Sequence, residues 1–222
     1  MDAAHGGATL LSDQHRHLLN GISRADSVVW DAHKMLFMPA LSAFVFYKKK
    51  SHRYAAFEQE APYLFDPTNP GIAEYDSGTQ TIECTKRALG FAVWGIWSLF
   101  GREFFRDLVD VTFDLTQQLH GMLSDATDFE PLHQPECNIQ VFRYSPKEVH
   151  DWDKARLGDF QLELRRRVIT SGNAYIVPIK IDGVGALRAT VIHPCTKLDD
   201  QRYVLDEIRR CGQELLDEKT WS

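Results

Sequence analysis

Short apolar runs dominate the first fifty residues of the chain. Residues 27–30 and 43–47 are rich in valine, phenylalanine and tryptophan, a composition typical of buried strands. Residues 1–9 predict the end of a strand and a glycine loop, and residues 12–19 predict a short helix. We therefore expect two neighbouring strands of an α/β sheet with a loop between them.

The middle of the chain changes character twice. Residues 51–80 lack periodicity and are rich in turn residues, which predicts a loop long enough to be functional or disordered. Apolar side chains then recur at three- and four-residue steps over residues 83–125, which predicts helix, with Gly101 dividing it into two. We expect its aromatic face to be core or subunit interface. The face comprises Phe91, Trp94, Trp97, Phe100, Phe104, Leu108, Val111 and Leu115.

The last hundred residues predict a small separate unit, an antiparallel sheet with helices packed on it. Asp182-Gly183 is a hairpin signal, and Ser171-Gly172 is a typical helix end. Strands are expected at residues 137–143, 174–181 and 186–192, and helices at residues 151–170 and 198–216.

Composition is that of an ordinary soluble globular protein. Hydrophobic residues make up 44% and charged residues 25%, and the net charge of −6 argues against a nucleic-acid surface. The longest apolar stretch, residues 88–100, is shorter than the roughly 20 residues of a membrane span, and no signal peptide is visible. The four cysteines show neither CxxC spacing nor a disulfide framework, so we expect reduced thiols and a cytoplasmic protein.

The candidate chemistry lies where the first strand ends, at His33-Lys34. A lysine flanked by apolar residues can be partly desolvated, which disfavours its ammonium form and favours a nucleophilic amine. A solvated surface pair is the alternative. His15 and His17 are two positions apart and so point to different sides of a helix, and we expect no metal site.

Residues 31–34, Asp-Ala-His-Lys, resemble the Schiff-base lysine motif of the pyridoxal-phosphate-dependent group II amino acid decarboxylases. Residues 1–7, 17–27 and 60–66 resemble the flanking and loop segments of that family, and the resemblance covers essentially the whole chain. It implies an α/β fold, the C-terminal part of a fold type I (aspartate aminotransferase-like) large domain followed by a small α+β C-terminal domain.

The resemblance also implies domain boundaries. Residues 1–91 match the C-terminal portion of the large cofactor-binding domain, including a mobile loop at residues 51–80, and residues 92–222 match the small domain. Because a family member has about twice this length, we expect the chain to be the C-terminal half only. The phosphate-binding turn and about half of the central sheet then lie in the half that is missing, which leaves apolar strand edges exposed.

The resemblance assigns five residues around the cofactor. Lys34 matches the lysine that forms the Schiff base with pyridoxal 5'-phosphate, and Asp2 matches the aspartate that keeps the ring nitrogen protonated. Ala4 matches a small residue against one ring face, and His33 a histidine near the phosphate. Thr85 stands where the family usually has a glycine that approaches the partner subunit's cofactor phosphate. A frayed terminal carboxylate is the alternative for Asp2, and a structural histidine for His33.

Three further residues bear on the substrate. Tyr63 matches the loop tyrosine that acts as general acid after decarboxylation. Arg188 matches an arginine that approaches the substrate carboxylate, which a guanidinium can hold through two parallel hydrogen bonds. Arg143 is either a second such contact or, as we favour, a surface pair.

The implied function is pyridoxal-phosphate-dependent decarboxylation of a small-molecule L-amino acid to its amine and CO₂, in a homodimer whose active site lies at the subunit interface. Glutamate, aspartate, cysteine sulfinate and diaminobutyrate all remain open as substrates. The alternative is a truncated or split non-catalytic fragment that needs a missing N-terminal half or a partner chain. A third hypothesis is another reaction of the same cofactor, such as transamination.

Overall fold

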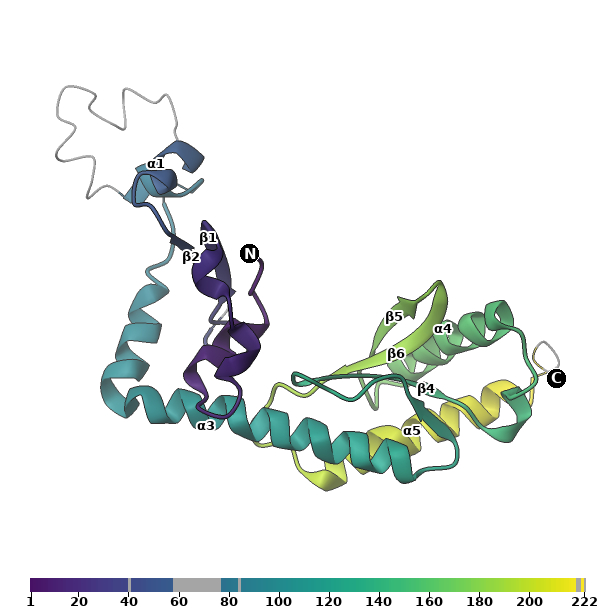
Figure 1. Cartoon of the computed structure of the whole chain (residues 1–222). Coiled ribbons are helices and arrows are strands. Elements are labelled where there is room, and N and C mark those ends of the chain that lie inside the picture. The colour runs from purple at the N-terminus through teal and green to yellow at the C-terminus, as the bar shows by residue number, and fades with distance from the viewer. Residues whose placement is uncertain (40, 58–76, 84, 219–220, 222) are drawn as a thin grey trace. The chain divides into compact units, whose positions relative to one another are not determined.

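The computed structural model describes residues 1–39, 41–57, 77–83, 85–218 and 221. They form two compact units, Met1–Val109 (unit 1) and Asp110–Ser222 (unit 2), and each is described by itself (Figure 1). Helix α3 (Gly90–Asp125) contributes residues to both. The domain boundary expected after residue 91 stays a prediction, because these units are defined by packing within this chain alone.

Unit 1 is organised by a two-stranded antiparallel sheet, β1 (Ser27–Asp31) and β2 (Ala43–Tyr47), as predicted. The first residues of the chain run parallel to β1 on its other side. The Ala3 amide donates to the Val29 carbonyl at 3.0 Å, and the Val29 amide donates to the Met1 carbonyl at 3.1 Å. These hydrogen bonds join chain segments that are far apart in sequence.

The segment before β1 consists of 3₁₀ turns. The prediction of a helix over residues 12–19 is wrong, because this segment forms 3₁₀ turns. Another 3₁₀ turn stands where a loop was expected after Ala4. These turns are η1 (Gly6–Leu11), η2 (Arg16–Leu19) and η3 (Ile22–Arg24). The Ser12 hydroxyl accepts hydrogen bonds from the amides of Gln14 and His15, which stabilise the turn between η1 and η2.

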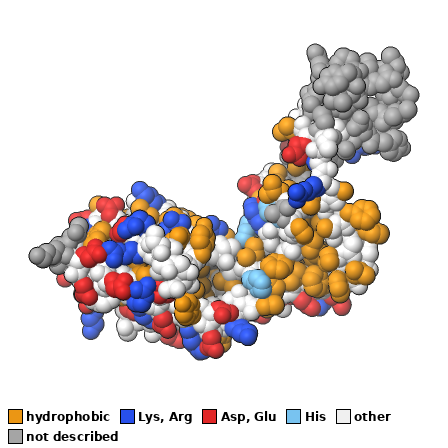
Figure 2. All heavy atoms as spheres, turned by 180° about the vertical axis from the view of Figure 1, so that it is seen from behind, with side chains coloured by type: hydrophobic (Ala, Val, Ile, Leu, Met, Phe, Trp, Pro, Cys, Tyr) orange, Lys and Arg blue, Asp and Glu red, His pale blue; other side chains and the backbone are white. Residues whose placement is uncertain are grey.

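The burial predicted for the two strands is wrong. Side chains of β1 are half-buried, and Val45 and Phe46 of β2 are 45% and 46% exposed. Among the described residues no strand pairs with the outer edge of β2, so part of its apolar surface stays uncovered. Figure 2 shows hydrophobic side chains gathered on the surface that unit 1 forms.

The ends of the predicted long loop are structured. Helix α1 (His52–Phe57) and the 3₁₀ turn η4 (Ser77–Gln80) occupy them, so the expectation of no secondary structure over residues 51–80 is wrong there. Residues 58–76, which include the apolar cluster at residues 63–65, lie outside the described part of the chain.

Helix α3 begins at Gly90 rather than at residue 83. Gly101 has φ 70° and ψ −171°, a backbone conformation outside the helical region, which confirms the predicted division. Phe105 and Leu108, beyond the kink, are buried in unit 1, whereas Phe91 and Phe100 are 71% and 57% exposed. The first half of the aromatic face is therefore not core of this unit, and a subunit interface there stays a prediction.

Unit 2 is a four-stranded antiparallel sheet in the order β3-β4-β6-β5, with α4 and α5 packed against it (Figure 1). The hairpin is confirmed, since Asp182 and Gly183 have φ 50° and 80°. The three-residue strand β3 and the 3₁₀ turn η5 were not predicted. The elements are β3 (Phe129–Pro131), β4 (Ile139–Tyr144), η5 (Lys147–Val149), α4 (Lys154–Thr170), β5 (Val177–Ile181), β6 (Val184–Thr190) and α5 (Leu198–Leu216).

The core of unit 2 lies between the sheet and its helices. Tyr144 from β4, Phe160 from α4 and Leu187 from β6 contribute to it, each at most 4% exposed. Asp153 caps α4 by accepting from the Arg156 amide at 2.9 Å. The expected antiparallel sheet with packed helices is confirmed.

Candidate active site

The candidate active site of unit 1 is the tight turn that follows β1. The Lys34 amide donates to the Asp31 carbonyl at 3.3 Å, and the Phe37 amide donates to the Lys34 carbonyl at 3.1 Å. On either side of Lys34, Ala32 and Met35 are at most 1% exposed. Buried neighbours thus hold the turn while the lysine side chain extends from it.

The carboxylate of Asp31, at the end of β1, lies close to the side chains of His33 and Lys34. Asp31 Oδ2 lies 2.8 Å from Lys34 Nζ and 3.8 Å from His33 Nε2. The Asp31 side chain is only 13% exposed, and that of Lys34 is 37% exposed. Because an ammonium has no lone pair, Lys34 must part from Asp31 and lose a proton before it can attack an aldehyde.

Asp31 is a residue of this site to which the sequence analysis gave no role. The signal was present, since Asp31 opens the motif that ends in Lys34. A three-residue spacing brings side chains together in a turn, but not in the extended strand that ends at Asp31. The choice between the two required the structure.

His33 is fixed by the loop that leads into β2. Its Nδ1 lies 2.8 Å from the Ser42 carbonyl oxygen and 3.1 Å from the Ser42 amide nitrogen, and its own amide donates to the same carbonyl at 3.2 Å. Each tautomer of the ring satisfies only one of these two contacts, because Nδ1 either donates to the carbonyl or accepts from the amide. In either case Nε2 faces Asp31, so the ring links the ends of the lysine loop.

Asp2 and Ala4 lie beside the same strand. Asp2 Oδ1 accepts from the Ala4 amide at 2.9 Å, and the Ala4 carbonyl accepts from the Asp31 amide at 3.1 Å. The terminal amino group of Met1 donates to the Ser27 carbonyl at 2.8 Å. The segment that carries Asp2 is thus hydrogen-bonded along β1, although the Asp2 side chain itself is exposed.

A close contact fixes the backbone after Ala4. A Cβ on Gly7 would lie 2.7 Å from Trp30 Cδ1, closer than side chains tolerate, so Gly7 lets the chain pass directly over this β1 side chain. Together with the bonds to β1, this contact brings Asp2, Ala4, Asp31, His33 and Lys34 into one region of unit 1.

The donor set fits part of a pyridoxal phosphate site. It offers an amine for an aldehyde, a carboxylate for a ring nitrogen, and a small side chain beside which a flat ring can lie. In the described ranges no three His, Cys, Asp or Glu side chains gather where they could hold a metal ion.

Of the remaining predicted site residues, the structure describes Thr85 and Arg188. Thr85 is exposed and lines a surface groove of unit 1 with Leu41 and Ser42. Arg188 belongs to β6 of unit 2, where it is half-buried and lines a cavity of about 390 Å³. Tyr63 lies outside the described residues.

Arg143 forms a pair within the sheet of unit 2. Its Nε donates to the Gly185 carbonyl at 3.1 Å, and its Nη1 lies 3.4 Å from Glu130 Oε2. The side chain is only 12% exposed. Arg143 therefore forms an ion pair, but it is not the surface residue that we favoured, because its side chain is covered while that of Glu130 is 50% exposed.

Comparison with known proteins identifies the class. The pyridoxal-dependent decarboxylase conserved domain matches residues 1–145. The chain belongs to this family of pyridoxal-phosphate-dependent amino acid decarboxylases, which confirms the resemblance.

The relatives are considerably longer than this chain. The acidic amino acid decarboxylase GADL1 of Xenopus tropicalis is 30% identical over 97% of the chain and 43% of its own length, and that of mouse is 29% identical over 97% and 40%. The match to the crystal structure of mouse CSAD covers 96% of this chain and 45% of the CSAD chain, with 27% identity and a TM-score of 0.82. The chain thus spans less than half the length of these relatives.

The fold class is confirmed by the solved structures. The crystal structure of Oryza sativa TDC with PLP and tryptamine has a TM-score of 0.82 at 20% identity, a likeness that shows the fold alone. Within the ranges that the structure describes, no helix combines the length and the apolar character needed to cross a bilayer.

Proposed function

We propose that this chain forms part of an enzyme that decarboxylates an L-amino acid with pyridoxal 5'-phosphate, and that Lys34 holds the cofactor through a Schiff base. The supporting observation is the position of the Lys34–Asp31 pair at the end of β1, beside the hydrogen-bonded segment that carries Asp2 and Ala4. Family membership supports the reaction class.

The cofactor, when bound, supplies an electron sink for the electrons left behind by CO₂. Asp2 provides a carboxylate for the ring nitrogen, and Ala4 leaves room for the ring. Asp31 forms an ion pair with the Lys34 ammonium while the lysine is not bound to the cofactor. This pair keeps the lysine nitrogen close to the position where it would bind. His33, tied to Ser42, holds the lysine loop in this geometry.

Two residues would act on the substrate. Arg188 binds the substrate carboxylate through its guanidinium, and Tyr63 delivers a proton to the carbon that has lost CO₂. Thr85 would contact the cofactor phosphate of a partner subunit. These roles rest on the family match and on the residue chemistry, and each is testable by substitution.

The substrates to test first are acidic amino acids, because the similar proteins carry the name acidic amino acid decarboxylase. We propose that the protein is a homodimer. We also propose that it is cytoplasmic, in line with the free cysteines at positions 137, 195 and 211. A chain that spans less than half of its relatives' length also supports the second candidate, a fragment that acts only together with a partner polypeptide.

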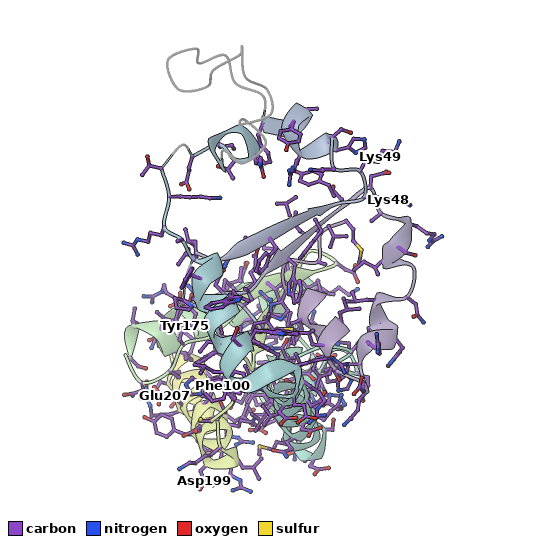
Figure 3. All side chains as sticks on the ribbon, turned by 90° about the vertical axis from the view of Figure 1, so that its left-hand side faces the viewer. Lys48, Lys49, Phe100, Tyr175, Asp199 and Glu207 are labelled. Atoms are coloured by element: carbon purple, nitrogen blue, oxygen red, sulfur yellow. The ribbon has the colours of Figure 1, made fainter. Side chains whose placement is uncertain are left out.

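Borohydride trapping tests the proposal. The purified chain, alone and with candidate partners, is incubated with pyridoxal phosphate, reduced and digested. We expect the phosphopyridoxyl mass on the peptide that carries Lys34, and its loss in Lys34→Ala. Lys48→Ala is the matched control, since Lys48 lies at the exposed end of β2 and donates to the Ser23 carbonyl (Figure 3).

Two results would count against Lys34 as the cofactor lysine. Label distributed over Lys48, Lys49 and Lys50 would indicate reaction with surface amines only. Label on the Lys34 peptide that survives in Lys34→Ala would place the reactive amine elsewhere.

A further inference from the structure

A cavity of about 390 Å³ lies in unit 2, between one end of the sheet and helix α5. Val177, the first residue of β5, pairs with Arg188. Ala189 and Thr190 therefore extend β6 beyond the start of β5. The cavity lies beside this end of β6 and reaches Leu205 on α5. It is thus built from residues of unit 2 alone.

The walls of the cavity are mainly apolar. Leu119 from α3, Phe142 from β4 and Leu205 from α5 line it, and each is at most 4% exposed. Ala189 from β6 and Val191, just after that strand, complete the wall. Apolar walls with a few polar groups are typical of small-molecule sites, whose volumes range from about 300 to about 1,000 Å³. The cavity therefore suits a compact apolar molecule that is flat enough to lie between a strand and a helix.

The cavity lies on the opposite side of β6 from the Arg188 side chain. Leu187 belongs to the core of unit 2, and Ala189 packs against that core. Because side chains alternate along a strand, Arg188 directs its guanidinium to the other face of the sheet. Arg188 therefore borders the cavity through its backbone. A ligand in the cavity and a carboxylate at the guanidinium would occupy different faces of β6.

A buried acceptor in the cavity wall lacks a hydrogen-bond donor. Gln201 on α5 lines the cavity and is 5% exposed. Its Nε2 donates to the Leu115 carbonyl at 2.9 Å, which fixes the orientation of the side-chain amide. In the part of the chain that the structure describes, no group donates to Gln201 Oε1. Since a buried acceptor without a donor is destabilising, a ligand that supplies one N–H or O–H group is favoured here.

The polar side chains at the rim of the cavity are engaged with their own loop. Asp200 Oδ2 accepts from the Lys197 amide at 2.8 Å, and His193 Nδ1 accepts from the Cys195 amide at 3.1 Å. A charged ligand would lose its hydration among the apolar walls without gaining a counterion there, which is costly. The cavity therefore favours a neutral molecule over an amino acid or an amine, both of which carry charge.

We propose that this cavity binds a neutral, flat, apolar molecule of one or two rings that donates one hydrogen bond to Gln201 Oε1. The inference does not rest on the proposed function, because the site uses neither Lys34 nor the face of β6 that carries the Arg188 guanidinium. A bound ligand would contact Ala189 and so stabilise the end of β6 beside Arg188.

Indole and indene are the probes that test the proposal. They share one shape, and only indole carries an N–H donor. The full chain is titrated with each probe while the NMR signals of its methyl groups are followed. We expect saturable shifts at the methyl groups of Leu119, Val191 and Leu205, which line the cavity. Indole should bind about fivefold more tightly than indene, the net effect of one hydrogen bond.

Three variants sharpen the test, each checked for folding by circular dichroism. Gln201→Met keeps the length of the side chain but removes the acceptor, so the preference for indole over indene should disappear. Ala189→Leu fills the cavity and should weaken the binding of both probes by at least about tenfold. Ala155→Leu is the matched control, because it makes the same change at an exposed position of α4 and should leave both affinities unchanged.

The opposite results would refute the proposal. These are no saturable shift at the cavity methyl groups, equal affinity of the natural chain for the two probes, or binding that a folded Ala189→Leu variant retains. Shifts confined to unit 1, where Phe91 and Trp94 are exposed, would show only unspecific binding to apolar surface and would also refute it. Shifts at the cavity methyl groups that follow chain concentration without a probe would make a second copy the occupant. If Ala189→Leu does not fold, the comparison of the two probes on the natural chain decides.

Discussion

Helix α4 contacts β6 through two glycines, and an alanine at either should separate them. A Cβ on Gly158 would lie 2.7 Å from the Gly185 backbone nitrogen, against at least 3.4 Å for ordinary contact, so the helix must move by about 0.7 Å (3.4 − 2.7). The obstacle is backbone, which cannot rotate away. We expect Gly158→Ala to cost about 3 kcal/mol through overpacking, offset by about 1 kcal/mol of helix propensity.

Gly121 provides the matched control. It is also a helical glycine of unit 2, and a Cβ there meets no heavy atom within 4 Å. Gly121→Ala should therefore stabilise the protein by up to about 1 kcal/mol. The two alanine variants should differ by about 3 kcal/mol in the free energy of unfolding, although the chemical change is identical.

Urea unfolding followed by near-ultraviolet circular dichroism measures the difference. Trp152 and Trp221 report on this region, because their rings lie 5.4 and 5.5 Å from that of Phe160, two residues after Gly158. Equal stability of the two variants, or a more stable Gly158→Ala, would refute the close contact. A confirmed contact would also show how α4 positions β6, the strand that carries Arg188.

Three further predictions concern single side chains. The Arg210 guanidinium donates to Glu207 and holds the pKa of that carboxyl at about 2, below its ordinary 4.5. Because the pKa is lower in the folded state than in the unfolded state, the ionised carboxylate stabilises the fold. This stabilisation is present above pH 4.5 and is lost as the pH falls toward 2. Urea midpoints between pH 2 and 6 should therefore fall less steeply in Glu207→Gln than in the natural chain. Arg209 holds Asp128 through two nitrogens at 2.6 and 3.0 Å, so Arg209→Lys, which cannot form a planar fork, should lower the free energy of unfolding by about 1 kcal/mol in the same melts, and no loss would contradict it. Gly7→Ala should displace the Trp30 ring and lower the thermal midpoint by several degrees, while Gly6→Ala, with open space at its Cβ, should not.

Local pattern was sufficient for much of the secondary structure. The periodicity of α5 predicted its bounds, and Asp182-Gly183 predicted the hairpin, because a helix face and a type I′ turn depend on residues close in sequence. The single turns in place of a helix at residues 12–19 show the limit. Two or three apolar positions do not distinguish a 3₁₀ turn from a short α-helix.

The candidate site was predictable in part. Lys34, His33 and Asp2 came from the motif and its flanks, since the chemistry of an imine lysine restricts the residue types. The role of Asp31 was not predictable, because it depends on the turn that folds Lys34 back toward the end of β1. Strand β3 was missed because three residues show no usable alternation and are stabilised only by the neighbouring β4.

The sequence by itself determined which segments are apolar, where helix α4 ends and where the candidate cofactor lysine stands. Only the tertiary structure decided which apolar faces are covered. Leu108 and Phe100 belong to the same predicted face, yet one is 8% and the other 57% exposed, and among the described residues no strand covers Val45 at the outer edge of β2. Hydrophobic periodicity reports that a face can be buried, whereas burial itself requires a partner element, and that partner is set by packing between segments far apart in the chain.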